Sequence, residues 1–355
     1  MPDQTQQFVF EELNTLSEKV TKTEGVPEDL THRLEQMIKR LDRMAKLGHY
    51  ASEFDTLSRY IEVVTSIPWT KRTEDNLDLE ETQRILDKNH YGMQSVKERL
   101  LEYLATMQLI KSRGEDAIAR SPILLLVGLQ GVGKTTLAVS ISEALGREFI
   151  RIALGAIGST VELRGKSKAL EGSEPGQIVK ALIKTQVMNP VILLDEIEKA
   201  SGQTGLLSDV MAVLLEILDP VQNIAFRDHY IDYPIDLSDV LFICSANNLG
   251  TLSTALLDRM EVIKMPSYTD DEKIVIARDY LLPKIIANAG LKPEEMQIDP
   301  ELWPSVVRPF GFDTGIRSLN RTLQSMSRKV AKEIVEGKHE GALITSENLK
   351  HYLPK

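Results

Sequence analysis

The segment that most constrains the fold of this chain runs from Pro122 to Thr136 and reads PILLLVGLQGVGKTT. Its first part, Ile123 to Val127, is apolar, and a glycine-rich loop follows that ends in Lys134 and Thr135. An apolar run in front of such a loop predicts a buried parallel strand, a tight turn and the start of a helix. The main-chain N–H groups of the loop and the positive end of the helix together attract phosphate. The segment therefore predicts a phosphate-binding loop.

Two side chains of the loop have the chemistry that a nucleoside triphosphate requires. Lys134 can reach the β- and γ-phosphates, and the Thr135 hydroxyl can bind Mg²⁺. A glycine-rich turn that carries Lys-Thr by chance is the alternative, but the order of strand, loop and helix favours phosphate binding. The candidate nucleotide-binding residues of the loop are Gly128, Leu129, Gln130, Gly131, Val132, Gly133, Lys134, Thr135 and Thr136.

Strand and helix patterns alternate after the loop. The expected helices are 137–145, 178–187 and 207–218, and the expected strands are 149–153, 191–194 and 240–244. A glycine-rich stretch, 155–176, and a polar stretch, 219–239, lie between them. Alternation of this kind predicts an α/β fold, in which a parallel sheet carries helices on both faces and binds its ligand at the carboxyl ends of the strands.

Helical patterns dominate both ends of the chain. The other expected elements are helices at 30–47, 53–67, 79–89, 96–110, 271–286, 300–307 and 314–336, a short helix before Gly25, a linker at 69–78 and a short apolar piece at 342–344. We therefore predict a helical leader (1–70), a nucleotide-binding αβα domain (71–269) and a small C-terminal helical domain (270–355).

The helix that follows Pro27 is amphipathic. Its apolar residues recur at steps of three or four: Leu30, Leu34, Met37, Leu41, Met44 and Leu47. Such a stripe packs either on neighbouring helices or on a partner in a coiled coil. The heptad run is short, so we favour packing on neighbouring helices.

Composition narrows the function classes. The 355 residues carry 52 acidic and 42 basic side chains, and this net charge of −10 argues against nucleic acid as the main ligand. The single cysteine, Cys244, leaves no internal disulfide and no cysteine-based zinc site. No apolar run is long enough to span a bilayer and the N-terminus has no signal-peptide pattern, so we expect a cytoplasmic protein without a membrane contact. The six histidines lack metal-binding spacing, so we expect no metal besides nucleotide-bound Mg²⁺.

Two carboxylates end the apolar run VILLDE, which covers Val191 to Glu196. Hydrolysis of a nucleotide needs one acid that orders Mg²⁺ and a second that orients or deprotonates water. Asp195 suits the first role and Glu196 the second. Acidic residues also follow strands as helix caps, but their place downstream of a phosphate loop favours the catalytic interpretation.

Three further polar residues are candidates that pattern alone leaves open. Asn247 follows the next apolar run and can either align a water molecule or sit in a turn. Arg259 and Arg317 are isolated arginines, and most such residues are solvated or paired at the surface. Phosphoryl transfer does need a cation against the developing charge, but spacing does not show which arginine supplies it.

Longer strings resemble the AAA+ ATPase module of Lon-type ATP-dependent proteases. The similar segments are LLVGLQGVGKTTLA, VILLDEIEKA, DPVQNIAFRDHYIDYPIDLSDV, LLDRMEVI and GFDTGIRSLNR. Upstream, VPEDLTHRLEQMIKRLDRM, SIPWTKRTEDNLDL and DKNHYGMQSVKERLLEYLA resemble the end of the Lon N-terminal region and the entry to its ATPase module. The resemblance runs from about residue 26 to the C-terminus and implies a P-loop NTPase core with a helical lid.

The resemblance implies a role for each candidate. Those roles are Walker A for Gly128 to Thr136, Walker B for Asp195 and Glu196, sensor 1 for Asn247, an arginine finger for Arg259, sensor 2 for Arg317 and the adenine border for Tyr91 and Gly92. It also implies ATP and Mg²⁺ as cofactors, with Thr135 and Asp195 at the metal. An arginine finger acts on a neighbouring subunit, so we expect a homo-oligomeric ring, a hexamer.

Two departures from the family pattern bear on function. Lon proteases continue into a domain with a Ser-Lys dyad, but this sequence ends at Lys355 and contains no PKDGPSAG-like string. We therefore expect no peptidase activity from this chain alone. In the loop that lines the family's central pore, Leu170 and Glu171 replace an aromatic–aliphatic pair. Leu170 can still grip a polypeptide through apolar contact, whereas a ring of Glu171 carboxylates repels acidic segments.

Three functional hypotheses follow. The first is an ATPase that hydrolyses ATP to remodel or unfold a protein partner. The second is the ATPase half of a Lon protease whose peptidase lies on another chain or outside this sequence. The third is a nucleotide-dependent scaffold or switch that does not hydrolyse ATP. A DNA-binding regulator is disfavoured by the acidic balance.

Overall fold

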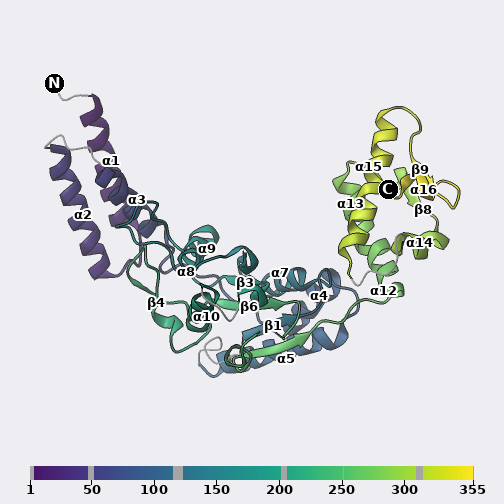
Figure 1. Cartoon of the computed structure of the whole chain (residues 1–355), viewed down its shortest axis with the longest axis horizontal. Coiled ribbons are helices and arrows are strands. Elements are labelled where there is room, and N and C mark those ends of the chain that lie inside the picture. Colours follow the sequence, from purple (N-terminus) through teal and green to yellow (C-terminus); the bar gives the residue numbers. More distant parts are fainter. Residues whose placement is uncertain are drawn as a thin grey trace.

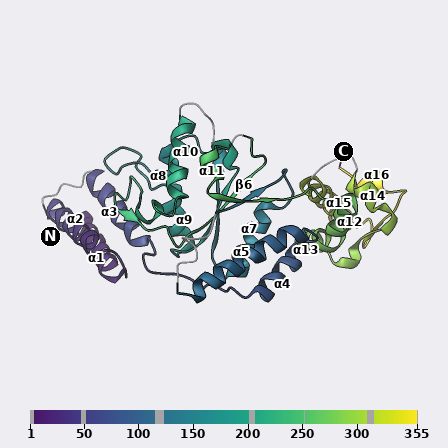
Figure 2. The ribbon, with the colours of Figure 1, turned by 90° about the horizontal axis from the view of Figure 1, so that it is seen from below.

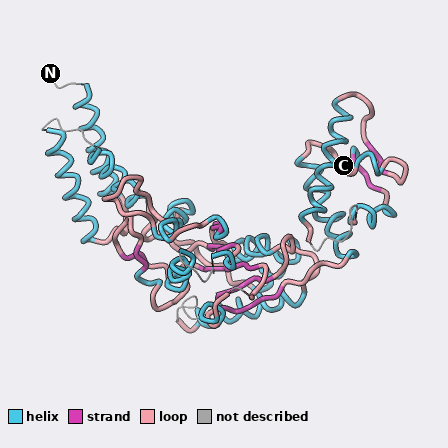
Figure 3. Tube along the Cα trace, in the orientation of Figure 1, coloured by secondary structure: helices cyan, strands magenta, loops and turns pink. Residues whose placement is uncertain are grey.

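The computed structural model describes residues 4–46, 52–114, 123–200, 206–250, 252–308 and 315–354. The chain forms an open arc, in which the N-terminal helices and the C-terminal domain rise from opposite ends of a central α/β core (Figure 1). Strands concentrate in this core, and short strands recur in the C-terminal domain (Figure 3). Among the described residues, no helix has the length and apolar character that spanning a membrane requires.

A five-stranded parallel sheet organises the core, in the order β2-β3-β6-β1-β7. Its strands are β1 (Ile123–Val127), β2 (Phe149–Ala153), β3 (Val191–Asp195), β6 (Leu241–Ala246) and β7 (Met260–Lys264). Since all strands run the same way, the loops that follow β1, β3 and β6 meet at one edge of the sheet. The predicted α/β class is confirmed.

The fifth strand is a correction to the expected sheet. We predicted no strand at Met260–Lys264, yet β7 pairs with β1 along its whole length. It is an edge strand, and two of its five residues, Met260 and Ile263, are buried. A half-exposed strand with polar Glu261 and Lys264 lacks the continuous apolar run that revealed the central strands.

Side-chain alternation along the strands divides the core into two layers. Leu125 faces one layer, and Leu124 and Leu126 face the other. The second layer packs against α4 (Leu79–Asn89), α5 (Gln94–Ser112) and α7 (Lys134–Leu145). The first packs against α8 (Thr160–Arg164), α9 (Gln177–Thr185) and α10 (Leu206–Ile217). Figure 2 shows α4, α5 and α7 below strand β6 and α10 above it.

The leader consists of α1 (Gln4–Lys22), α2 (Glu28–Lys46) and α3 (Ser52–Ser66), so the first helix is longer than predicted. Leu30, Leu34 and Leu41 of α2 are fully buried and belong to the same hydrophobic cluster as α1, α3 and the first layer of the core. The apolar stripe therefore packs on neighbouring helices, as predicted. Its last member, Leu47, and Gly48 lie outside the described residues.

Tyr60 of α3 joins the leader to the core. Its hydroxyl donates to the Ile231 carbonyl oxygen at 2.8 Å, and its ring centroid lies 5.8 Å from that of Tyr230. Both partners belong to a hairpin inside the stretch that we predicted only as polar. Its short strands are β4 (Phe226–Arg227) and β5 (Pro234–Ile235).

The C-terminal domain has its own hydrophobic cluster, which is separate from both layers of the core. Its elements are α12 (Asp270–Val275), the π-helical turn η4 (Ile276–Leu281), α13 (Leu282–Asn288), β8 (Met296–Ile298), α14 (Trp303–Val307), α15 (Arg317–Val335), β9 (Ala342–Ile344) and α16 (Leu349–Tyr352). Helices dominate the domain, as predicted, and the short apolar piece at 342–344 is strand β9, which pairs in parallel with β8. Residue 314, the expected start of the long helix, lies outside the described residues.

Short elements complete the described chain. They are η1 (Leu154–Ala156), η2 (Ile197–Ala200), η3 (Asn223–Ala225), α11 (Thr254–Leu257), η5 (Pro293–Glu295) and η6 (Pro300–Leu302). The division of the chain at residues 70 and 270 stays a proposal, and the leader shares a hydrophobic cluster with the core.

Candidate nucleotide-binding site

A cavity of about 510 Å³ lies at the carboxyl ends of the strands, between the core and the C-terminal domain. Of the predicted site residues, those that line it are Tyr91, Gln130, Gly131, Val132, Gly133, Lys134, Thr135, Thr136, Asp195, Glu196, Asn247 and Arg317. Residues that sequence reasoning missed complete the lining: Asn89, His90, Arg151, Tyr268, Ile276, Tyr280, Leu281, Lys284, Ile316 and Asn320. The loops after β1, β3 and β6 thus converge on one cavity.

The C-terminal domain contacts the phosphate loop directly. The Ile316 N–H donates to the Gly131 carbonyl oxygen at 3.0 Å. A Cβ atom at Gly315 would lie only 2.5 Å from the Gln130 carbonyl oxygen, and Gly131 has a φ of +83°. Both positions therefore need glycine, since any side chain would push the two backbones apart.

Lys134 is held by three oxygen atoms at the base of the cavity. Its Nζ donates to the carbonyl oxygens of Gly128 (2.5 Å) and Leu129 (3.0 Å) and to Oδ1 of Asn247 (3.0 Å). Burial lowers the pKa of Lys134, and the nearby carboxylates, Asp195 foremost, oppose that shift. Gly128 and Leu129 do not line the cavity, but their carbonyl oxygens hold the Lys134 side chain in place.

Asp195 is buried at the end of β3, and both of its carboxylate oxygens accept hydrogen bonds. The Ser245 hydroxyl of β6 donates to Oδ1, and the Arg151 guanidinium of β2 donates to Oδ2 at 2.6 Å. Asp195 and Thr135 both line the cavity, and carboxylate and hydroxyl oxygens suit Mg²⁺. We propose that these two residues hold the ion.

Glu196 follows in a strained turn. Its φ of +59° is rare for a side-chain-bearing residue, and its N–H donates to the Ser245 hydroxyl at 3.2 Å. Its Oε2 accepts from Lys199 Nζ at 2.6 Å. Glu196, like Asp195, lines the cavity.

The two candidate arginines lie at different places. Arg317 begins α15 and lines the cavity. Arg259 does not line the cavity. Its carbonyl oxygen accepts a hydrogen bond from the Ile123 N–H, so Arg259 lies at the amino end of β1. The five residues of β1 place it roughly 16 Å from the phosphate loop. Its guanidinium bonds to Asp219 Oδ2 (3.1 Å) and the Ala255 carbonyl oxygen (2.8 Å).

Aromatic and apolar residues form another part of the cavity lining. Tyr91 packs edge-on against Tyr280 with ring centroids 6.3 Å apart, and Tyr268 lies beside Met93. Gly92, also predicted at the adenine, does not line the cavity, because its Cα faces the Glu272 side chain. The lining residues from α13 and η4 were missed, since only folding brings the C-terminal domain here.

His90 makes the stability of the fold depend on pH. It is buried, its Nε2 lies 3.0 Å from the Ser140 hydroxyl, and burial, with Lys97 nearby, lowers its pKa from 6.5 to about 4. Because the folded pKa lies below the unfolded one, the neutral ring stabilises the fold fully above pH 6.5, and this contribution is lost as the pH falls to 4. The loss is on the order of 3 kcal/mol.

We therefore expect acid to lower the melting temperature of the wild type more than that of His90→Gln, as measured by calorimetry at pH 7.5 and pH 5. The exposed His32→Gln variant is the matched control and should respond as the wild type does. Equal acid sensitivity of the His90→Gln variant and the wild type would contradict the assignment.

The predicted pore-loop residues lie away from the cavity. Leu170 is 56% exposed and Glu171 is exposed. Their loop is closed at its base by a bridge between Lys166 and Glu174, and Lys166 also donates to the Glu171 carbonyl oxygen. The loop is therefore a compact turn that presents both side chains to solvent.

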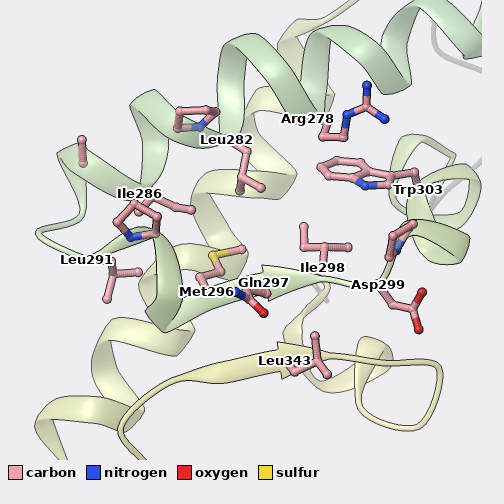
Figure 4. A pocket seen from close by; sticks show the side chains of 14 residues that line it. Arg278, Leu282, Ile286, Leu291, Met296, Gln297, Ile298, Asp299, Trp303 and Leu343 are labelled. Atoms are coloured by element: carbon pink, nitrogen blue, oxygen red, sulfur yellow. The ribbon is translucent and has the colours of Figure 1, made fainter.

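A second cavity, of about 690 Å³, lies within the C-terminal domain (Figure 4). Figure 4 shows Leu282, Ile286 and Trp303 around it. Its lining is mostly apolar, and its one arginine, Arg278, is paired with Asp279 at 2.7 Å. The first cavity, with its phosphate loop and carboxylates, is the better match for a nucleotide.

Comparisons with known proteins agree with this geometry. Residues 124–267 match the ATPase family associated with various cellular activities (AAA), and residues 287–343 match the Lon protease AAA+ ATPase lid domain. Lon protease 1 of Bacillus subtilis is 42% identical over 97% of this chain and 43% of its own length. Lon protease of Acinetobacter baumannii is 39% identical over 99% of this chain and 44% of its own length.

The similarity extends to Lon protease 2 of Thermus thermophilus, which is 37% identical over 99% of this chain and 46% of its own length. The chain thus spans less than half the length of these relatives. The two family matches cover the sheet and residues 287–343 of the C-terminal domain, and the relatives also cover the leader. With its five-stranded core and its lid, this chain carries the AAA+ ATPase module of the Lon family.

Proposed function

We propose that this chain binds ATP with Mg²⁺ and hydrolyses it to remodel or unfold a protein partner, as one subunit of a homo-oligomeric ring. The observation that carries the proposal is the convergence of Lys134, Asp195, Glu196 and Asn247 on one cavity. A cation, a metal-binding carboxylate, a second carboxylate and an amide are the groups that phosphoryl transfer to water requires.

Each residue has a separate task in the proposed reaction. Lys134 exchanges one of its oxygen partners for a phosphate oxygen, and Glu196 orients and deprotonates the attacking water. Asn247 directs its amide at the γ-phosphate or the water, and Arg317 of the lid adds positive charge. Mg²⁺, when bound, would supply positive charge against the phosphates.

The position of Arg259 supports a ring. Its guanidinium lies at the opposite end of β1 from its own phosphate loop, so it cannot reach its own γ-phosphate. A head-to-tail contact between copies would bring it to the nucleotide of a neighbour, and repeated contacts of this type close into a ring. We propose a hexamer.

The protein partner is inferred from the relatives and the exposed loop. The relatives are Lon proteases, and we propose that this chain acts either on a protein substrate directly or with a peptidase on another chain. The exposed Leu170 can contact a polypeptide, whereas Glu171 favours the alternative of a nucleotide-dependent scaffold or switch. Turnover distinguishes the motor from the scaffold, since only the motor hydrolyses ATP.

The test is ATP turnover per chain, measured across a range of chain concentrations. We expect specific activity to rise with concentration and then level off, because the arginine of one copy completes the site of another. Tight ATP binding without turnover at any concentration would reject the motor in favour of the scaffold.

A further inference from the structure

Glu198 lies directly behind Asn247. It belongs to η2, the turn that follows Asp195 and Glu196, and it does not line the nucleotide cavity. Its Oε1 accepts two hydrogen bonds from Asn247, one from the side-chain Nδ2 at 2.6 Å and one from the backbone N–H at 3.1 Å. One carboxylate oxygen thus holds both the backbone and the side chain of Asn247.

These contacts determine which way the Asn247 amide faces. Lys134 is only a donor and a carboxylate is only an acceptor, so Oδ1 must face Lys134 and Nδ2 must face Glu198. A rotated amide would set Nδ2 against a cation and Oδ1 against an anion. Nδ2 carries a second N–H besides the one that Glu198 takes, and Asn247 lines the cavity.

The strained turn explains how Glu198 reaches β6. Cys244 pairs with Leu194, so Ser245 lies opposite Asp195 and Asn247 lies just beyond the end of β3. The left-handed Glu196 reverses the chain there, and its N–H bonds to the Ser245 hydroxyl. The reversal carries Glu198 back over the end of β6, where it meets Asn247.

We infer that Glu198 is a positioning residue for hydrolysis: it orients the Asn247 amide so that Nδ2 can donate to the γ-phosphate. The inference rests on the proposed hydrolysis of ATP and adds to it a group outside the cavity. Glu198 does not line the cavity, so its hydrogen bonds reach the reaction through Asn247, while its charge also stabilises the Lys134 ammonium group.

The first test is a double-mutant cycle in ATP turnover. We expect Glu198→Ala to lower kcat roughly ten- to a hundredfold, the usual effect of losing hydrogen bonds to a charged group, and to raise KM as the contact with the γ-phosphate weakens. Glu198→Gln should rescue most of the activity, because its carbonyl oxygen can accept both hydrogen bonds. Adding Glu198→Ala to Asn247→Ala should lower kcat no further.

The exposed Glu347→Ala variant is the matched control and should leave kcat unchanged. Thermal melting shows that each variant is folded. A kcat of Glu198→Ala within about twofold of the wild type overturns the inference, and so does an effect that simply adds to that of Asn247→Ala.

A second test does not depend on hydrolysis and therefore separates this inference from the proposed function. Calorimetric titration measures the affinity of the chain for ATPγS and for ADP. Because only ATPγS carries a γ-phosphate group, the ratio of the two affinities reports contact with that group. We expect Glu198→Ala and Asn247→Ala to lower this ratio by the same factor and Glu198→Gln to restore it. If the wild type does not turn over ATP, the proposed motor fails, and an unchanged ratio in Glu198→Ala would still overturn the positioning role.

Discussion

Replacing Lys134 with alanine should abolish ATP turnover, with a loss of at least about 10²-fold in kcat, because no other lysine of the lining lies in the phosphate loop. ATP affinity should also fall roughly ten- to a hundredfold, since the charged hydrogen bond to phosphate is lost. Turnover by a coupled phosphate-release assay and affinity by calorimetry measure the two effects.

The fold should tolerate this change. Lys134 contacts two carbonyl oxygens and one amide oxygen, and water entering the cavity can replace it at all three. The melting temperature without nucleotide should therefore change little, whereas the rise that ATP causes in the wild type should disappear. The exposed Lys350→Ala variant is the control and should behave as the wild type. Full turnover by Lys134→Ala would show that the cavity is not the site of hydrolysis.

Replacing Arg259 with alanine should lower turnover on the order of 10³-fold and leave ATP affinity per chain nearly unchanged. The two effects separate because Arg259 lies away from the cavity of its own chain. Its ion pair with Asp219 is partly exposed, so the loss in stability should stay within about 1 kcal/mol. Affinity, turnover and melting temperature are measured on the same preparation.

Mixing two inactive variants tests whether Arg259 acts on a neighbour. Arg259→Ala chains keep Glu196, and Glu196→Gln chains keep Arg259. In a mixed ring, an Arg259→Ala chain can receive the arginine of a Glu196→Gln neighbour, so turnover should reappear on mixing. The exposed Arg227→Ala variant is the matched control and should retain full turnover. Two outcomes would contradict an arginine that acts between subunits. One is a mixture that turns over ATP no faster than either variant alone, and the other is full turnover by Arg259→Ala alone.

Local pattern was sufficient for much of the fold. The central strands β1, β3 and β6 are buried on both faces, so each is an apolar run that can be read without its neighbours. The phosphate loop is equally local, because its strand, glycines and lysine are contiguous. The stripe of α2 also follows from spacing, which fixes one face of a helix whatever it packs against.

Tertiary structure alone decided the rest of the candidate site. Edge strand β7 and the three-residue strands β8 and β9 exist because partners pair with them, and so short a pattern is ambiguous by itself. Arg151 and Glu198 reach the site from different strands and turns through the register of β2, β3 and β6. Gly92 is adjacent to Tyr91 in sequence, yet it does not line the cavity.

The sequence by itself therefore determined the fold class, the family and the residues of the phosphate loop, because these depend on contiguous segments. Only the tertiary structure decided which side chains meet across the strand ends, how Asn247 is oriented and that Arg259 lies apart from its own cavity. The physical reason is that hydrogen bonds and ion pairs act over a few ångströms, and residues far apart in the chain come that close only when the sheet and lid assemble.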